Sequence, residues 1–358
     1  MFKKIFLVSA FCFNLAFGGF DSMIHSQRGE EVLEIFDIEP SFLNNEHFLD
    51  VKNSFFSGKK KIYTLKRFEE GYEFIPTLKE MLLKEGIPQE FLYLAMVESE
   101  FSLQAKSRKK AVGLWQFMPR TAKHMGLDIN SQIDERKDPI RSTQAAIAYL
   151  KSLKQTFGKW YLAAIAYNCG ETRLKKAITL ANSDSLSVLL DPEAKYIPLE
   201  SRVYIRKILS VSLLMHNVNT LEAKDYDYFL NRGASSLVAK VNTAPGTPLA
   251  NIAKEAGLSL KELKKYNPHF KRNITPTYAK VANIYMPYQF LAKYQEKNEG
   301  KKINLTAKPY LVHRVNKGET ISSISKRYGI SIAKIKNYNA LKNAHLLSIN
   351  QEILIPLG

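Results

Sequence analysis

Glu98 is the residue of this sequence best suited to acid–base chemistry. It follows the apolar run 91–96 and falls on the last turn of a helix that should begin just after Pro88. Because that helix is apolar on every face, it should be buried. A carboxyl group at its end loses hydration, which disfavours the charged form and should raise the pKa of Glu98. Glu98 is therefore a candidate general acid.

A structural role for Glu98 is the alternative, because a carboxylate at a helix end can simply pair with Lys106, Arg108 or Lys109. The segment after the helix favours chemistry. It is polar, turns at Gly113, and then places aromatic and methionine side chains around the single amide of Gln116. Such a surface suits a sugar or another amphipathic ligand.

Two of the aromatic residues near Gln116 also have a simpler interpretation. For Trp115 and Phe117 taken alone, packing in the core is the better one, and Met118 could equally be a core residue. Both interpretations stay open at this point.

Four motifs follow one another along the chain. They are Glu98-Ser99-x-Phe101; Ala105-x-Ser107 with Gly113-Leu114-Trp115-Gln116-Phe117-Met118-Pro119-x-Thr121-Ala122; Ala163-Ala164-Ile165-Ala166-Tyr167-Asn168-Cys169-Gly170; and Tyr196-Ile197-Pro198-x-Glu200-Ser201-Arg202-x-Tyr204. In this order they closely resemble the motifs of lytic transglycosylases with the soluble-type catalytic domain. The resemblance covers roughly residues 75–217 and is nearest to the membrane-bound type D enzymes, in which LysM modules follow the catalytic domain.

The resemblance implies an enzyme that cleaves peptidoglycan between N-acetylmuramic acid and N-acetylglucosamine without a cofactor or metal. Glu98 would protonate the glycosidic oxygen and then accept the proton of the sugar's own 6-hydroxyl, which leaves a 1,6-anhydromuramoyl end. A glycosidase normally needs two carboxylates. Here Glu100 would point elsewhere on a continuing helix, and Glu200 is interpreted as structural, pairing Arg202 or another arginine.

The resemblance also implies which residues contact the substrate. Cys169 stands where the family usually has alanine, so a small buried residue is expected there rather than a nucleophile. The implied substrate-binding residues are Ser107, Gln116, Met118, Tyr167, Asn168 and Tyr196.

Composition and the N-terminus indicate an exported protein with an anionic partner. The chain has 358 residues, 45% hydrophobic residues and a formal net charge of +18, so it can fold into two or three domains and attract acidic polymers. Lys3 and Lys4 precede the apolar run 5–17, which is short for a membrane span and resembles a signal peptide cleaved near Gly18. We therefore expect a periplasmic or cell-envelope location and a carboxylate-bearing cell wall as partner.

Residues that typically begin or end helices predict a series of helices. Asp138 should cap a long helix that ends before Gly158, and Pro and Gly bound several others. The expected helices span 77–84, 91–98, 119–125, 139–157, 160–168 and 205–215, with a short one at 30–36 and a basic turn at 55–61.

Two similar segments follow at a constant offset of 72 residues, which is the spacing from Ile252 to Ile324. Each predicts strand, helix, helix, strand. The second closely resembles a LysM module, which implies glycan binding. The first has Pro248 where Thr320 stands in the second, and an extra loop at 269–282, so its sugar binding is doubtful and a spacer role is about as good.

The expected fold class is α+β, with a mainly α-helical lysozyme-like catalytic domain followed by two small βααβ LysM-type modules. The expected parts are a signal peptide (1–18), an N-terminal extension packed on the catalytic domain (19–74), the catalytic domain (75–217), a linker (218–236), a degenerate LysM-like module (237–288), a linker (289–308) and a LysM module (309–358).

Three alternatives to the transglycosylase remain. A non-catalytic peptidoglycan-binding scaffold would be expected to have degraded catalytic motifs, and a hydrolytic muramidase on the same fold would add water to its product. A nucleic-acid-binding protein has only the charge in its favour and conflicts with the export signal. No metal-ligand spacing or Gly-rich phosphate loop is present in the sequence.

Overall fold

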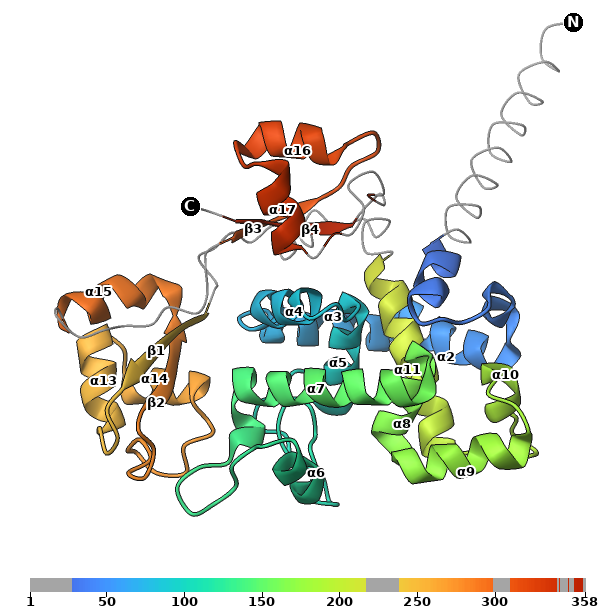
Figure 1. Cartoon of the computed structure of the whole chain (residues 1–358), viewed down its shortest axis with the longest axis horizontal. Coiled ribbons are helices and arrows are strands. Elements are labelled where there is room, and N and C mark those ends of the chain that lie inside the picture. Colours follow the sequence, from blue (N-terminus) through green and yellow to red (C-terminus); the bar gives the residue numbers. More distant parts are fainter. Residues whose placement is uncertain are drawn as a thin grey trace, which may run out of the picture. The chain divides into compact units, whose positions relative to one another are not determined.

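A computed structural model describes residues 28–216, 238–298, 310–339, 341, 347 and 351–356. These residues are mainly helical, and two small modules follow the helical part along the chain (Figure 1). The expected signal peptide and the linker at 218–236 lie outside the described residues. No helix among the described residues is long and apolar enough to cross a membrane.

Internal contacts divide the chain into two compact units, which are described separately below. The first unit holds the described residues up to Lys61 and those from Leu153 to the end of α11. The second holds Ile62–Ser152 and the described residues of the two modules.

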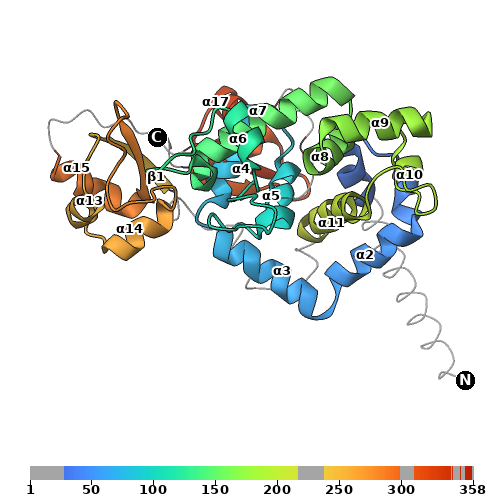
Figure 2. The same ribbon diagram turned by 90° about the horizontal axis from the view of Figure 1, so that it is seen from below.

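In the first unit, α11 (Leu199–His216) packs against α2 (Glu46–Phe56) and α8 (Trp160–Cys169) (Figure 2). The side chain of Asn45 caps α2 by accepting a hydrogen bond from the backbone N–H of Phe48, at 3.0 Å. The other described elements are a helix over residues 28–35, η1 (Pro40–Asn44), α9 (Glu171–Ala181) and α10 (Leu186–Leu189).

The N-terminal region was the least readable from the sequence. The expected short helix at 30–36 is present over residues 28–35. The turn expected at 55–61 is present but shorter, because only Ser57 separates α2 from α3 (Gly58–Gly71) and the three lysines after Gly58 are helical. A positive φ of +58° at Gly58 lets the chain turn within this single break.

In the second unit, the expected helix boundaries are confirmed to within a few residues. Asp138 caps α7 (Pro139–Phe157), because its Oδ1 accepts hydrogen bonds from the backbone N–H groups of Ile140 and Arg141 at 2.9 and 2.8 Å. The remaining helices before the modules are α4 (Ile75–Lys84), η2 (Gln89–Phe91), α5 (Leu92–Ser99), α6 (Pro119–His124) and η3 (Glu135–Lys137).

Helix α5 is buried along its first five residues, as its apolar sequence predicted. Burying a large apolar side chain contributes roughly 1.5–3 kcal/mol each. Packing on all sides therefore fixes α5, and with it the position of Glu98 on the last turn.

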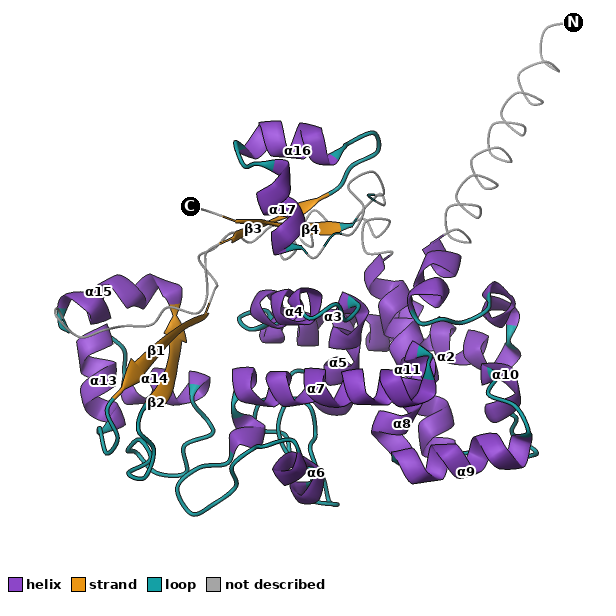
Figure 3. Ribbon diagram, in the orientation of Figure 1, coloured by secondary structure: helices purple, strands orange, loops and turns teal. Residues whose placement is uncertain are grey.

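The strands of the described residues belong to the two modules (Figure 3). In the first module, β1 (Val238–Thr243) pairs antiparallel with β2 (Ala282–Pro287), and α13 (Leu249–Ala256) and α14 (Leu260–Tyr266) lie between them in sequence. The core of this module includes Val241, Ile252, Leu263, Ile284 and Met286.

The first residues of the linker expected at 289–308 belong to the first module instead. After η6 (Tyr288–Phe290), the chain forms α15 (Leu291–Glu296), and Leu291 and Tyr294 are buried in the core of the first module. Because the residues around Leu291 and Tyr294 are mainly polar, the sequence did not predict this helix.

The second module repeats the order with β3 (Tyr310–Arg314), α16 (Ile321–Tyr328), α17 (Ile332–Tyr338) and β4 (Glu352–Pro356). Thr320 and Ser323 form a reciprocal capping box at the start of α16. Together the two modules confirm the predicted strand–helix–helix–strand pattern.

Candidate active site

Glu98 is half-buried on the last turn of α5. The neighbouring Ser99 side chain anchors this turn, because its Oγ donates to the carbonyl oxygens of Ala95 and Leu114 at 3.1 and 2.7 Å. The second of these bonds joins the end of α5 to the loop that carries Gln116. The Ser99 side chain thus links the turn that carries Glu98 to the loop that carries Gln116.

The chain turns sharply directly after Glu98. Glu100 and Phe101 both have left-handed backbone conformations, with φ of +53° and +61°. Each costs roughly 1–2 kcal/mol for a residue other than glycine. Burial of Phe101 against Phe68, with ring centroids 4.9 Å apart, offsets that cost.

Glu100 does not share the surroundings of Glu98. It is exposed, and its carboxylate accepts a hydrogen bond from the hydroxyl of Tyr63 on α3. The expected continuing helix is not present at Glu100, because α5 ends at Ser99. The two carboxylates differ in that Glu98 is half-buried and Glu100 is exposed.

The predicted residues Ser107 and Gln116 lie in one folded loop. The backbone N–H of Gly113 donates to the carbonyl of Ala105 at 2.8 Å, and Ser107 Oγ accepts from the backbone N–H of Ala111 at 3.0 Å. The Gln116 amide donates to the carbonyl of Gly113 at 2.7 Å. These contacts hold both side chains half-buried at the edge of the loop.

The side chains around Gln116 separate into buried and exposed ones. Trp115 is fully buried and donates from Nε1 to Thr143 Oγ1 on α7, at 2.8 Å, and Phe117 is buried as well. Both are core residues, so they offer no aromatic face to a sugar. Met118 is 43% exposed, and the core interpretation of this residue is therefore wrong.

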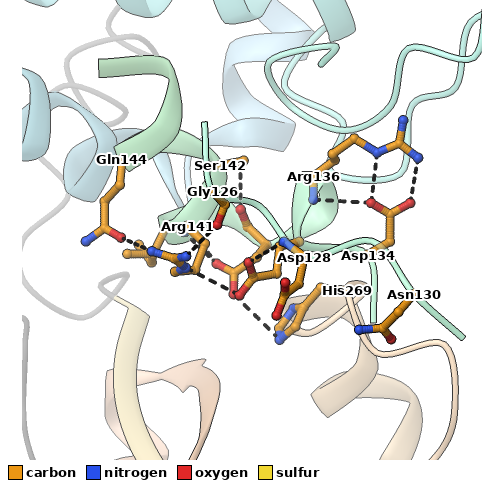
Figure 4. Close-up of polar contacts among 12 residues, drawn as sticks. Gly126, Asp128, Asn130, Asp134, Arg136, Arg141, Ser142, Gln144 and His269 are labelled. Atoms are coloured by element: carbon orange, nitrogen blue, oxygen red, sulfur yellow. Dashed lines mark hydrogen bonds and ion pairs between the residues drawn. The ribbon is translucent and has the colours of Figure 1, made fainter. Parts of the chain in front are cut away.

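A buried ion pair that the sequence did not reveal supports this loop (Figure 4). Arg136 donates from Nε and Nη2 to the carboxylate of Asp134, at 2.9 and 2.8 Å, and from Nη1 to the carbonyls of Lys110 and Phe117. Burial tends to raise the pKa of Asp134, but the hydrogen bonds and charge of Arg136 hold it below its ordinary value. The loop that carries Gln116 also lies very close to the backbone of Arg136. A Cβ added to Gly113 would stand 1.8 Å from the Arg136 carbonyl oxygen.

Three further predicted residues belong to the first unit. Tyr167 and Asn168 are half-buried on the last turn of α8, and Tyr196 is half-buried just before α11. Ser201 on α11, which was not singled out from the sequence, donates to Asn168 Oδ1 at 2.7 Å. This bond brings the third and fourth motifs together. Their consecutive order along the chain was the only sequence feature that could have suggested the contact.

Two other residues of these motifs bear on the chemistry. Burial raises the pKa of the Cys169 thiol, which keeps it protonated and argues against a nucleophile there. Glu200 is exposed in the first turn of α11.

A second polar cluster joins the first module to the start of α7. Asp138 Oδ2 accepts a hydrogen bond from the Tyr285 hydroxyl at 3.0 Å and lies 3.7 Å from His269 Nε2. All three side chains are almost fully buried. Burial lowers the pKa of His269 more than Asp138 raises it, so the imidazole is neutral at pH 7.

Backbone and apolar contacts extend this junction. Asp134 N–H donates to the His269 carbonyl and Lys271 N–H to the Gln132 carbonyl, both at 2.9 Å, while Ile133 belongs to the apolar core of the module. The first module is thus built into the second unit through the segment before α7 and is not a free appendage of it.

Comparisons with known proteins give three family matches along the chain. The family model "Transglycosylase SLT domain" matches residues 77–188, "Lytic transglycosylase MltD, LysM-like domain" matches residues 238–302, and "LysM domain" matches residues 313–356. Residues 77–188 thus match the transglycosylase SLT family, and the LysM-like and LysM families match the two modules after it. The family comparison thus confirms the sequence-based resemblance, and it matches the first module as a LysM-like domain.

A relative matches most of the chain. Membrane-bound lytic murein transglycosylase D of Escherichia coli strain K12 is 28% identical over 315 residues, which are 84% of this chain and 67% of the relative.

Two solved structures are similar over a smaller part. The 70 kDa soluble lytic transglycosylase of Escherichia coli is 26% identical with a TM-score of 0.32, and an inactive mutant of lytic transglycosylase Slt from Pseudomonas aeruginosa is 22% identical with a TM-score of 0.33. The matches cover 38% and 40% of this chain, but only 22% and 24% of those two chains.

Proposed function

We propose that the chain is a murein lytic transglycosylase that uses Glu98 as its single acid and base. The observation that carries the proposal is the placement of Glu98, half-buried at the end of a buried helix and inside the SLT match. The name of the Escherichia coli relative, which acts on murein, supports the choice of substrate.

The proposed reaction cleaves the β-1,4 bond between N-acetylmuramic acid and N-acetylglucosamine. Glu98 donates its proton to the glycosidic oxygen as the bond from that oxygen to C1 of the muramoyl residue breaks, and the acetamido group stabilises the developing cation. The 6-hydroxyl oxygen then bonds to C1, and its proton returns to Glu98. The product is a 1,6-anhydromuramoyl end, and no water is consumed.

The remaining predicted residues take supporting roles in this proposal. Substrate binding is assigned to Ser107, Gln116 and Met118 of the second motif and to Tyr167, Asn168 and Tyr196 of the third and fourth motifs. The second LysM module holds the glycan and raises the local concentration of substrate. We also propose that residues 1–18 direct export to the periplasm, where murein lies.

Digestion of purified sacculi by the full chain and by Glu98→Gln tests the proposal. Loss of a general acid typically costs about 10²–10⁴-fold in rate, so release of anhydromuropeptides should fall by at least about a hundredfold. Glu100→Gln is the matched control, because it makes the same chemical change at an exposed carboxylate two residues away. The control should keep its activity, and both variants should still bind sacculi.

Mass spectrometry of the products separates the alternatives. Products heavier by one water would show a hydrolytic muramidase, and binding without any product from the unaltered chain would show a scaffold. Equal product release from Glu98→Gln and the unaltered chain would refute the role of Glu98.

A further inference from the structure

The docked first module places α14 beside the loop that follows α5. Lys265 Nζ on α14 pairs with the Glu73 carboxylate at 3.0 Å, and the Tyr266 hydroxyl donates to the same carboxylate at 2.7 Å. Because Glu73 lies between α3 and α4, these bonds fix α14 against the helical part of the second unit. The surface between them therefore lies within the second unit.

A cavity of about 780 Å³ opens along this surface. Its volume lies in the range of small-ligand sites. The catalytic part contributes Gln104, and the module contributes three lysines and the side chain of Phe270. The residues used below are Gln104, Lys261, Lys264, Lys265 and Phe270.

The charge of the cavity favours an anion. Lys261 and Lys264 are exposed, and Lys264 Nζ donates to the uncharged amide oxygen of Asn273 at 2.9 Å, so that contact leaves its charge uncompensated. One acidic residue, Glu262, also lines the cavity, but its carboxylate accepts the backbone N–H of Ser259 at 2.7 Å in a capping box. The lysines thus outnumber the carboxylate, which is already engaged.

The cavity also lies within reach of the candidate acid. Six residue steps separate Gln104 from Glu98, and six residues span at most about 20 Å of extended chain. A four-residue peptide spans about 13 Å. Successive muramoyl residues of one strand can each carry such a peptide, so a strand bound at Glu98 presents several peptides to this part of the unit, and one of them can enter the cavity.

We propose that this cavity binds the peptide stem of murein through the stem's free carboxylates. The stem carboxylates would pair with Lys261 and Lys264, while Phe270 packs against the stem's aliphatic carbons. The inference rests on the proposed function for its substrate, and it assigns the LysM-like module to peptide recognition rather than to sugar binding.

Equilibrium binding to two kinds of glycan strand tests the inference. The full chain carrying Glu98→Gln, which prevents turnover, is titrated with strands that keep their peptides and with strands stripped of peptides by an amidase. Adding Lys261→Glu and Lys264→Glu should weaken binding to peptide-bearing strands about tenfold, because two exposed attractions become repulsions. Binding to stripped strands should not change.

A second double variant provides the matched control. Lys254→Glu and Lys297→Glu make the same charge change at exposed positions of the same module that do not line the cavity. They should leave both affinities unchanged. Thermal melting of each variant checks that the module stays folded.

Three results would overturn the inference. They are no loss on peptide-bearing strands, an equal loss on stripped strands, and an equal loss in the control pair. Mass spectrometry of the titrated strands checks that no product forms, so a change in affinity reports on the cavity, whereas product from Glu98→Gln counts against the proposed reaction. Failure here and failure of the proposed reaction are therefore distinguishable.

Discussion

Tyr285→Phe tests whether the buried junction stabilises the second unit. The substitution removes one hydroxyl, which donates to Asp138 Oδ2 at 3.0 Å in a fully buried environment, and leaves the ring in place. Hydrogen bonds to charged groups contribute about 1.5–3 kcal/mol. The free energy of unfolding should therefore fall by about 2 kcal/mol. The Asp138 cap of α7 should persist, because it uses the other carboxylate oxygen.

Tyr278→Phe is the matched control at the same junction. The Tyr278 hydroxyl accepts a hydrogen bond from Asn130 Nδ2 at 2.7 Å, but Tyr278 is 54% exposed and water can replace the lost partner. Its removal should change the free energy of unfolding by less than about 0.5 kcal/mol. Urea unfolding of the full chain measures both variants on the same scale.

The comparison isolates burial, since both variants lose one tyrosine hydroxyl that bridges the module and the helical part. Equal changes in the two variants, or a change below about 0.5 kcal/mol for Tyr285→Phe, would refute the reasoning. Unequal changes with an unaltered slope against urea would show that the native junction itself was weakened.

Two further predictions concern the same region. The lowered pKa of His269 means that the unfolded chain binds more protons below about pH 6.5, so stability should fall as the pH is lowered from 7 to 5. Melting temperatures across that range should fall less steeply in His269→Gln, and His124→Gln, at an exposed site, should keep the original dependence. Gly113→Ala should destabilise by more than about 3 kcal/mol in urea and abolish product release, because it combines a φ of +85° with a clash at the Arg136 carbonyl. Gly126→Ala has a similar φ of +75° but open space, so it should cost only about 1 kcal/mol, and similar losses at the two glycines would contradict the packing argument.

The helix boundaries were predictable because their chemistry is local. Asp138 caps α7 through backbone groups only two and three residues away, and Gly158 follows the last residue of that helix with a φ of +76°. Such signals are complete within one turn of the chain. The repeated pattern of the two modules was predictable for the same reason.

Burial around Gln116 was not predictable from the motif. An aromatic residue in a sugar-binding surface and one in a core have the same identity and the same sequence neighbours. Thr143, 28 residues away, decides the case by accepting the indole hydrogen of Trp115. Of Trp115, Phe117 and Met118, only Met118 is exposed.

The helix α15 was missed because its buried side chains are few. Leu291 and Tyr294 are three residues apart, and the residues between and after them are mainly polar. A single apolar pair at helical spacing is compatible with a linker or a helix. The apolar core of the first module decides between the two, and it is formed by residues distant in sequence.

The two modules differ at the start of their first helix, where Pro248 of the first module stands in the place of Thr320 in the second. In the second module Thr320 caps its own helix by accepting the N–H of Ser323. In the first module the extra loop does this work, because the Asn273 carbonyl accepts the N–H of Leu249 and Thr275 Oγ1 accepts that of Thr247.

The same loop reaches the helical part of the second unit at both of its ends. His269 lies beside Asp138, and Thr277 and Tyr278 contact Gln132 and Asn130. The loop therefore closes the start of α13 and docks the module with one set of residues.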